Sequence, residues 1–373
     1  CTVIRNEVVR DWEKGEFHPK EEAVLEEVMS ALEQGDEEKQ KRSLNILKGL
    51  GLDSRESQED AMVQQSRTEA VRDLLRPDKD VEDIPDRIKQ MAFALNLYYW
   101  NVPLSRIGLW LGKGKSTIYG WIIGLSAALW AVIKVWLMEK VEAGCVYIDE
   151  KWLKIRGKWH YWFLILDDET GLPVAGHLLP TRTRWACRWV LINLKRLGKY
   201  PRVIITDGLA GYISSIAAVF GKAKHLLCLF HHQQAVGCWV KKHLGSLPVE
   251  VANQIKKKMK KVIQTQDSRT VKRRLKSLEA EDVQNEWGIG SWISTMWKNL
   301  GRLIPSLRIN GYPRTTNKIE RFFGQFQRFY KTRRGFHSVE SAKRELVLFM
   351  VMHLFSQQAE SGKAPIEVII PQA

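Results

Sequence analysis

The sequence predicts an α/β protein, a mixed β-sheet with flanking helices, preceded by an all-helical N-terminal region. Two patterns carry this prediction. Short apolar runs that end in turns begin near residue 144 and are typical of strands, whereas apolar residues at helical spacing precede and separate them. Of the 373 residues, 45% are hydrophobic and 27% are charged, which are ordinary globular values and exclude a disordered or fibrous chain.

Charge divides the chain into an acidic leader and a basic body. Residues 1–86 hold 13 Lys and Arg against 23 Asp and Glu, a net charge of −10, and the remaining residues carry +26. We expect residues 1–83 to form an acidic helical region that serves as a solvated segment, a self-masking element or a protein-binding arm. The positive field of the body would concentrate a polyanion, and nucleic acid is the first candidate.

Residues 84–140 are predicted to form a DNA-binding region and a linking helix. Apolar residues at helical spacing indicate helices over 84–100 and 104–111, followed by a glycine turn at 112–114 and a third helix with Ser116 as its N-cap. Two short helices joined by a turn are typical of a helix-turn-helix, although a plain helical hairpin has the same pattern. The second helix of the motif would offer four residues to the major groove: Lys115, Ser116, Thr117 and Tyr119.

The stretch 118–138 is apolar enough to span a membrane, since Lys134 is its only charged residue. Its first third already belongs to the helix-turn-helix pattern, so we favour a helix buried between two domains and expect no membrane partner. The five cysteines are too few and too scattered for a disulfide scaffold and favour a reducing compartment. We expect the cytoplasm of a prokaryote, in association with the nucleoid, or the nucleus of a eukaryote.

Residues 141–358 are predicted to form the α/β domain. Strands are expected at 145–155, 159–166, 173–179, 202–206 and 224–229, with helices at 185–197 and 212–220. Three meandering strands, a helix and then strand–helix–strand give a mixed sheet with helices on its faces. This is the strand order of the ribonuclease-H-like fold.

A basic helical insertion is expected at about 240–300, followed by two helices at 317–330 and 339–355 and a tail at 359–373. The insertion could clamp a DNA backbone or simply present a solvated helical face. Trp292 and Trp297 could stack on a base displaced near a cleavage site, and packing in a core is the alternative.

Two carboxylates, Asp149 and Asp207, each stand at the end of a short apolar run. Parallel neighbouring strands would bring both to the same edge of the sheet, where α/β sites usually form. Carboxylates held close together repel each other and stay ionised most easily around a divalent cation, and hard oxygen ligands suit Mg²⁺ or Mn²⁺. Two such ions can activate a water or a 3′-hydroxyl and stabilise the leaving oxygen in phosphodiester displacement. Glu320, near the start of a later helix, would complete the ligand set.

Each acid also has a structural alternative. A strand-terminal Asp often caps the next turn, and Glu320 with Asn317 fits a capping box that ties down a helix start. Glu150 is a rival carboxylate, but in an extended strand it points to the opposite face from the residue before it. Asp167 and Asp168 lie in a turn. We therefore rank these three rivals lower.

Three blocks of sequence resemble insertion-sequence DDE transposases, in the order of that family and on the expected elements. The first comprises 147–150 (YIDE) and 154–161 (KIRGKWHY), the second is 205–208 (ITDG), and the third runs from 317–323 (NKIERFF) to 333–336 (RRGF). The resemblance covers about residues 84–355. It implies a ribonuclease-H-like catalytic domain and two Mg²⁺ or Mn²⁺ ions held by a catalytic triad: Asp149, Asp207 and Glu320.

The same resemblance implies DNA as the partner, both the terminal repeats of the element and the target. Many relatives have a Lys or Arg about two helical turns past the Glu, where this chain has Gln327. Residues near the third block that we expect to contact DNA are Arg321, Arg328, Lys331, Arg333 and Arg334. At least a homodimer is expected, because two element ends must be joined.

A shorter element, 228–231 (CLFH), resembles one seen in Mutator-like transposases. A zinc site of Cys228, His231, His232 and Cys238 is an alternative, although one tight cluster lacks the paired spacing of a zinc finger. Otherwise Cys228 would end a buried strand, and His231 could contact DNA or the edge of the active site.

These observations predict a DNA transposase that cleaves element ends in a metal-dependent reaction and transfers the freed 3′-hydroxyl to target DNA. Two alternatives remain open. One is a domesticated transposase that binds DNA in a sequence-specific way without catalysis, and the other is a ribonuclease-H-like nuclease.

Overall fold

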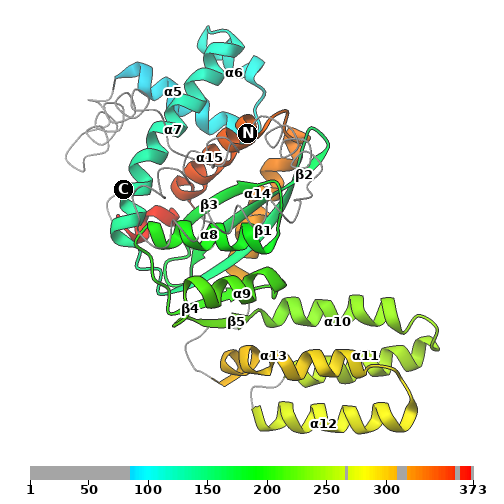
Figure 1. The fold of residues 1–373 in the computed structure, drawn as a ribbon. Helices are drawn as coiled ribbons and strands as arrows, with labels where there is room; N and C mark the ends of the chain where they lie inside the picture. Colours follow the sequence, from blue (N-terminus) through cyan, green and yellow to red (C-terminus); the bar gives the residue numbers. More distant parts are fainter. Residues whose placement is uncertain (1–84, 265–267, 309–316, 358–361, 371–373) are drawn as a thin grey trace, which may run out of the picture.

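The computed structural model describes residues 85–264, 268–308, 317–357 and 362–370, and Figure 1 labels their elements. The acidic region expected at 1–83 lies outside these residues. The described part contains a five-stranded mixed sheet and eleven α-helices, which confirms the predicted α/β class. Helices cover both faces of the sheet, and a group of four helices stands away from it (Figure 1).

The sheet has the strand order β3-β2-β1-β4-β5. Its first three strands form an antiparallel meander of β1 (Cys145–Ile155), β2 (Lys158–Asp167) and β3 (Pro173–Leu179). β4 (Val203–Thr206) pairs in parallel with β1, and β5 (Lys224–Leu227) pairs in parallel with β4. The expected order of strands is therefore present, and the assignment to the ribonuclease-H-like fold stays a prediction.

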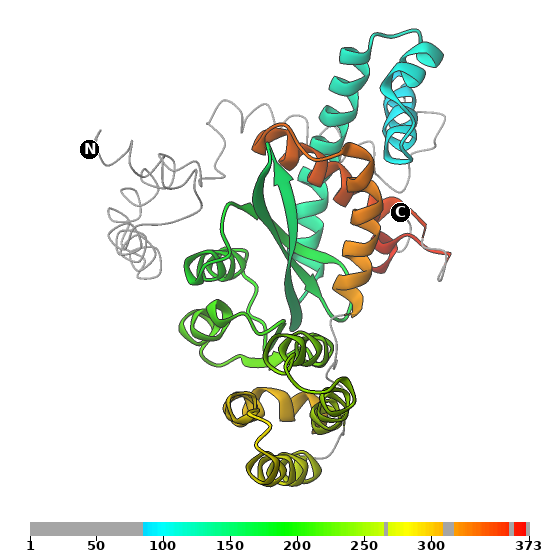
Figure 2. The ribbon, with the colours of Figure 1, turned by 90° about the vertical axis from the view of Figure 1, so that its right-hand side faces the viewer.

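Two layers of helices enclose the sheet (Figure 2). α8 (Arg184–Arg196) and α9 (Ala210–Val219) pack on one face, whereas α14 (Asn317–Arg333) and α15 (Val339–Phe355) supply most of the apolar residues that pack on the other. Each strand can serve both layers because its side chains alternate between the faces with a period of two.

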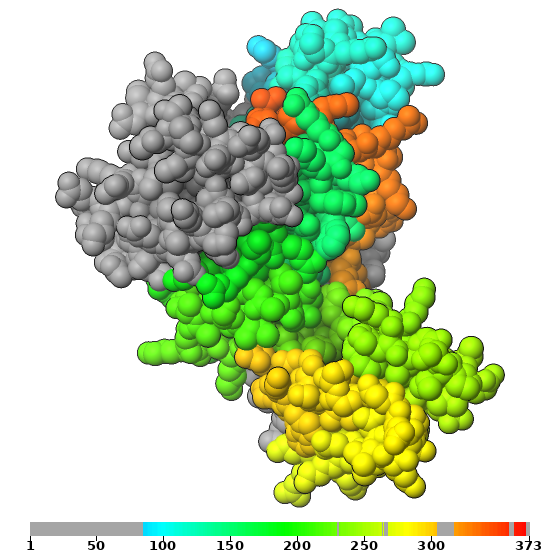
Figure 3. Space-filling view, turned by 45° about the vertical axis from the view of Figure 1, so that its right-hand side comes forward, coloured from blue at the N-terminus to red at the C-terminus, as the bar shows by residue number. Residues whose placement is uncertain are grey.

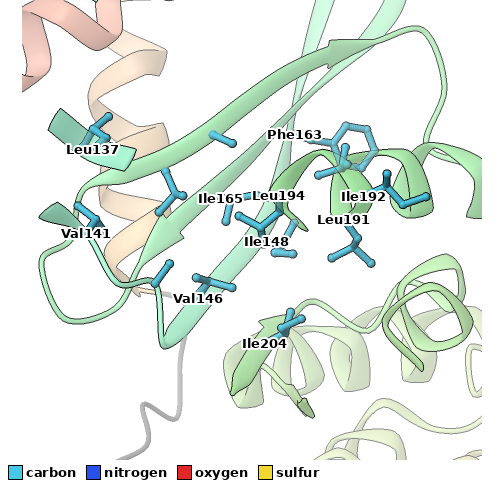
Figure 4. Packing of buried hydrophobic residues seen from close by; sticks show 14 of the residues in the cluster. Leu137, Val141, Val146, Ile148, Phe163, Ile165, Leu191, Ile192, Leu194 and Ile204 are labelled. Atoms are coloured by element: carbon cyan, nitrogen blue, oxygen red, sulfur yellow. The ribbon is translucent and has the colours of Figure 1, made fainter. Parts of the chain in front are cut away.

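One of the two cores is drawn in Figure 4. Ile148 of β1 and Ile165 of β2, which lie opposite each other in the ladder, are fully buried in the same cluster as Leu191 and Leu194 of α8 (Figure 4). Residues of the opposite parity, such as Leu164, belong to the cluster on the α14 side. The sheet thus separates two apolar cores, one on each of its faces.

The N-terminal helices are α5 (Asp86–Tyr99), α6 (Leu104–Leu111) and α7 (Lys115–Lys140). Gly112 closes α6 in the left-handed conformation, with φ of 61°, as expected of a glycine turn. The predicted N-cap was wrong: Gly114 occupies the cap position, the helix begins at Lys115, and no side chain caps it. The helix runs for 26 residues, so the expected recognition segment and the apolar helix expected at 118–138 form one continuous helix. The helix-turn-helix identity stays a prediction.

The length of α7 comes from its packing on the rest of the molecule. Ile118 and Ile122 near its start are buried with α5, α6 and α14, whereas Ile133 and Leu137 near its end belong to the core under α8. Among the described residues, it is the one helix long and apolar enough to cross a membrane by length and composition, and a third of its most apolar window is buried. This is weak evidence for a span.

The four helices that stand away from the sheet are α10 (Leu229–His243), α11 (Val249–Ile263), α12 (Ser268–Asn285) and α13 (Gly290–Arg308). They form a separate lobe in Figure 3 and bury an apolar cluster of their own. The strand expected at 224–229 was too long. The N–H of Cys228 still bonds Thr206 at 2.9 Å, but its carbonyl accepts from His232 at 3.2 Å and so opens α10.

Candidate active site

The register of the parallel strands brings the first two acids together. Tyr147 of β1 lies opposite Ile205 of β4, so two residues further along each chain Asp149 and Asp207 stand at the same edge. One carboxylate oxygen from each of these two residues and one from Glu150 lie within 4.8 Å of one another. Asp207 also caps its own turn, since its Oδ1 accepts from the Leu209 N–H at 2.9 Å.

Glu150 shares the cluster with Asp149 and Asp207, although strand alternation points it to the other face. It does point to the face opposite Asp149, as expected, because its Oε1 accepts a hydrogen bond of 2.6 Å from the hydroxyl of Tyr212 in α9. Its carboxylate nevertheless joins the cluster, and Arg182 bridges its Oε2 to the Oδ2 of Asp207 at 3.9 and 3.6 Å. Asp149 lies within β1 rather than at its end, because the strand continues to Ile155. The second carboxylate beside Asp149 in the sequence was the available signal for Glu150.

Glu320 approaches the same edge from the first turn of α14. Its Oε1 lies 3.8 Å from Nε2 of His231, which stands in the first turn of α10. These groups line one open cavity of about 470 Å³, which we call the acidic hollow. The charged residues that line it include Asp149, Glu150, Arg182, Asp207, His231 and Glu320.

Burial and mutual repulsion shift the acids of the hollow. Burial, with smaller contributions from Asp207 and Glu320, raises the pKa of Asp149 to about 6. Burial and the charge of Asp207 raise the pKa of Glu150 to about 8. A hydrogen bond with Cys228 and the nearby acids raise the pKa of His231 to about 9. His231, Arg182 and Lys151 are cations that line the hollow and offset this negative charge.

The donor set of the hollow fits a hard divalent cation. Asp149, Glu150 and Asp207 offer closely spaced carboxylate oxygens, and a bound cation would oppose the burial and repulsion that raise the pKa of Asp149 and of Glu150. A second group, Cys228, His231 and Glu320, also has donor atoms within 4.8 Å of one another. Of the four residues in the zinc alternative, Cys228 and His231 share that group, whereas Cys238 lies about two turns farther along α10.

A basic hollow adjoins the acidic one along α14. This cavity of about 540 Å³ is lined by Arg321, Arg328 and Lys331, three of the residues expected to contact DNA. Gly324 and Gln327 line both cavities. Gln327 occupies the position two turns past Glu320, and the cationic side chains stand beside it. The structure thus brings these predicted residues together next to the acids.

Other predicted DNA contacts lie elsewhere. Lys115, Ser116 and Thr117 are exposed at the start of α7, and Arg334 is exposed after α14. Arg333 is largely buried: its guanidinium bonds Glu345 of α15 at 3.0 Å and lies 3.3 Å from the centre of the Phe329 ring.

The remaining candidates pack inside the protein. The hydroxyl of Tyr119 lies 3.5 Å from Glu345. Trp292 is 7% exposed and Trp297 is partly buried, both in the core of the four-helix lobe. Asp167 is the last residue of β2 rather than a turn residue, and it accepts from Thr170 at 2.7 Å. Asp168 follows in the β2–β3 turn and accepts from Tyr147 at the same distance.

The fold and the site define a mixed α/β protein with clustered acids in a hollow at the edge of its sheet. Residues 182–358 match the family model described as Transposase, Mutator family, and this supports a transposase, an enzyme that processes DNA. The matched region contains Asp207, His231 and Glu320 and begins after Asp149. No curated protein matches the chain.

Proposed function

We propose that the chain is a DDE-type DNA transposase, which cleaves element ends in a metal-dependent reaction and transfers the freed 3′-hydroxyl strand into target DNA. One observation carries the proposal. Asp149, Asp207 and Glu320, which are far apart in the sequence, line a single hollow beside a basic one, within a chain that matches transposases. A hollow of this kind suits a phosphodiester, whose charge needs cations and whose displacement needs activated oxygens.

In this proposal, Asp149, Asp207 and Glu320 hold two Mg²⁺ or Mn²⁺ ions, with Glu150 as a further oxygen donor close by. When bound, such ions activate an attacking water or hydroxyl and stabilise the leaving oxygen of the phosphodiester. The fit rests on the oxygen donors and on the raised pKa values of Asp149 and Glu150, which a nearby cation would lower again.

The chain's cationic residues would position the DNA. Arg182 stands between two carboxylates and could exchange one of them for a phosphate oxygen, since its guanidinium offers several donors in one plane. Arg321, Arg328 and Lys331 of the basic hollow would hold the backbone on either side of the scissile phosphate. The exposed start of α7 would recognise the terminal repeats, with two copies of the chain needed to hold two ends.

The test uses purified full-length chain, Mn²⁺ and duplexes that carry the inverted repeats flanking its gene. We expect nicking and strand joining by the wild type and a loss of about a thousandfold or more in Asp207→Asn, because an amide is a weaker cation ligand than a carboxylate. Glu169→Gln is the matched control, since Glu169 is an exposed acid in the β2–β3 turn outside the hollow.

Three results would overturn the proposal. Equal cleavage by Asp207→Asn and wild type would show that the acidic hollow is not the active site. Sequence-specific binding without any cleavage by the wild type would make the chain a DNA-binding protein, and cleavage of RNA–DNA hybrids without strand joining would make it a nuclease.

A further inference from the structure

The β1–β2 hairpin extends beyond the helix layer that covers the rest of its face. On this face the directly opposed pairs are Ile148 with Ile165, then Glu150 with Phe163, then Trp152 with Tyr161, and finally Lys154 with Trp159. The first pair is buried under α8, whereas Trp152 and Trp159 are 46% and 48% exposed. The same face therefore changes along its length from apolar core to an open aromatic surface.

Three aromatic side chains form this surface, which we call the aromatic platform: Trp152, Trp159 and Tyr161. The Trp152 ring centre lies 5.8 Å from that of Trp159 and 5.4 Å from that of Tyr161, both in edge-to-face geometry. Such cross-strand contacts stabilise a hairpin by themselves. They do not account for two tryptophans that remain half exposed, each with a cation held against its ring.

Those cations are Lys154 and Arg182. The Lys154 ammonium lies 5.0 Å from the centre of the Trp159 ring, and the Arg182 guanidinium lies 5.3 Å from that of Trp152. Aromatic faces alternating with cations are what single-stranded nucleic acids bind, because the rings stack on bases while the cations pair with phosphates. The chemistry of the surface therefore favours nucleic acid over a second protein surface.

The platform is continuous with the acidic hollow. Trp152 itself lines the hollow, and Arg182 contacts both Trp152 and the carboxylates of Glu150 and Asp207. Trp152 follows Glu150 by two strand positions, about 7 Å along the chain. A strand whose phosphate enters the hollow would carry its neighbouring bases directly over these rings.

The back of the hairpin is held rigidly, so the platform is preorganised. The Lys154 N–H bonds the Tyr330 hydroxyl at 2.9 Å, and Arg156 Nε donates to the His337 carbonyl at 2.6 Å. Ile155 also forms a parallel bridge with Phe336 after α14. Stacking on a surface that is already ordered loses little conformational freedom.

We propose that the aromatic platform stacks unpaired bases of the DNA strand whose backbone enters the acidic hollow. The proposal rests on the proposed function, since it names which form of DNA that site accepts: a strand that is unpaired next to the cleavage point. It assigns binding to a part of the chain distinct from the expected helix-turn-helix and from the basic lobe.

The test measures binding without cleavage. A fluorescein-labelled oligothymidylate of about 20 nucleotides, longer than the ~4–16 that one single-strand module covers, is titrated with full-length protein in EDTA, and a blunt duplex of equal length is titrated in parallel. We expect Trp159→Ala to weaken single-strand binding about fivefold or more and to leave duplex binding within about twofold. Trp159→Phe should restore most of the loss, because it keeps a ring.

The matched control is Tyr200→Ala, which removes another exposed aromatic ring, 64% exposed, at the opposite end of β4 from Asp207. Unchanged melting temperatures would show that the variants fold. The proposal is overturned if Trp159→Ala binds the oligothymidylate as tightly as the wild type, or if both DNA forms lose affinity equally. A drop in oligomeric mass in Trp159→Ala would assign the face to contacts between copies of the chain instead.

Failure here is distinguishable from failure of the proposed function, because this assay needs neither cations nor cleavage. If the wild type binds single strands through Trp159 but never cuts DNA, the role of the platform is supported and the proposed transposase activity is overturned. If the wild type cuts DNA while Trp159→Ala binds single strands normally, the transposase activity is supported and the role of the platform is overturned.

Discussion

Glu150 makes a contribution to the free energy of unfolding that depends on pH. In the folded chain its pKa is raised from 4.5 to about 8, mainly by burial and then by Asp207, whereas Tyr212 donates to it and Arg182 lies near it. Between these two values the folded state keeps a proton that the unfolded state has released. Folding is therefore favoured at the low end of this range and loses that stabilisation as the pH rises through about 8.

We predict that Glu150→Gln makes the metal-free protein less sensitive to pH. The amide stays neutral and its oxygen still accepts from Tyr212, so between pH 5 and 8 the free energy of unfolding should fall by about 2–4 kcal/mol less than in the wild type. Urea unfolding in EDTA at several pH values measures this. Parallel pH profiles of the two proteins would contradict the prediction, and Glu169→Gln should behave as the wild type does.

At the scale of single residues, the sequence located the acids but could not rank all of them. Asp149 and Asp207 were placed correctly at one sheet edge because the parallel register follows from two recognisable apolar strands. Glu150 was ranked low on strand alternation alone. Alternation correctly predicted its direction, but not that its longer side chain and Arg182 would bring its carboxylate back to the cluster.

At the scale of elements, the α6–α7 turn depends on a close approach of two backbones. A Cβ at Gly108 would lie 2.5 Å from the carbonyl oxygen of Lys113, an atom that cannot move away without opening the turn. In contrast, Gly120 and Gly124 within α7 have nothing within 4 Å of that position.

We therefore predict that Gly108→Ala destabilises the protein by about 1–3 kcal/mol and misplaces the start of α7. Gly120→Ala, the matched control, should be neutral or stabilise by up to about 1 kcal/mol, because alanine favours a helix interior over glycine. Thermal unfolding measures the difference. If both variants unfold at the same temperature, the close approach of Gly108 to the Lys113 carbonyl does not affect stability.

Element boundaries were predicted where a local signal exists and missed where two elements share a residue. Pro173–Leu179 and Val339–Phe355 were predicted with their exact limits, since turn residues or a Ser338 cap mark them. Cys228 was assigned to a strand from its apolar neighbours. In the structure its backbone N–H does continue the ladder, but its carbonyl already belongs to α10. Apolar pattern cannot separate these two roles.

At the scale of the whole molecule, a buried polar network joins three helices that are distant in the chain. Glu345 of α15 is 5% exposed and accepts from Arg333 at the end of α14 and from the hydroxyl of Tyr98 in α5 at 2.9 Å. Arg333 also donates to Asn101 after α5 at 2.7 Å. The helix that carries Glu320 is thereby tied to the N-terminal helices.

Truncating this network should be costly. We predict that Glu345→Ala lowers the free energy of unfolding by about 3–5 kcal/mol, because it leaves the Arg333 charge buried without its partner. Asp86→Ala, which removes the 93% exposed partner of Lys89, should cost about 0.5 kcal/mol or less. Urea unfolding compares the two variants, and similar small losses would show that the network is not stabilising.

Sequence could not reveal this role of Arg333, because its partners come from other parts of the chain.

The basic four-helix lobe carries exposed lysines that could contact a DNA backbone. Lys257 of α11 and Lys272 of α12 are exposed there, whereas Lys195 and Lys222 are exposed at the opposite edge of the sheet from Asp207. If the lobe clamps DNA, replacing Lys257 and Lys272 by Gln should lower the slope of log affinity against log salt by about 1–2, since each phosphate contact contributes ~0.9.

The matched double variant of Lys195 and Lys222 should keep the wild-type slope. Duplex binding measured over a series of salt concentrations separates the two proteins. Identical slopes for both double variants would instead support the solvated helical face that the sequence also allowed.

The lobe has a consequence for how such chains diverge. Because α10–α13 bury an apolar cluster, and α10 begins and α14 follows at the rim that bears His231 and Glu320, these four helices form an insertion between β5 and α14. Evolution can lengthen, trim or exchange such an insertion without disturbing the three acids. Relatives are therefore better recognised by which strand or helix carries each acid than by the count of residues between them.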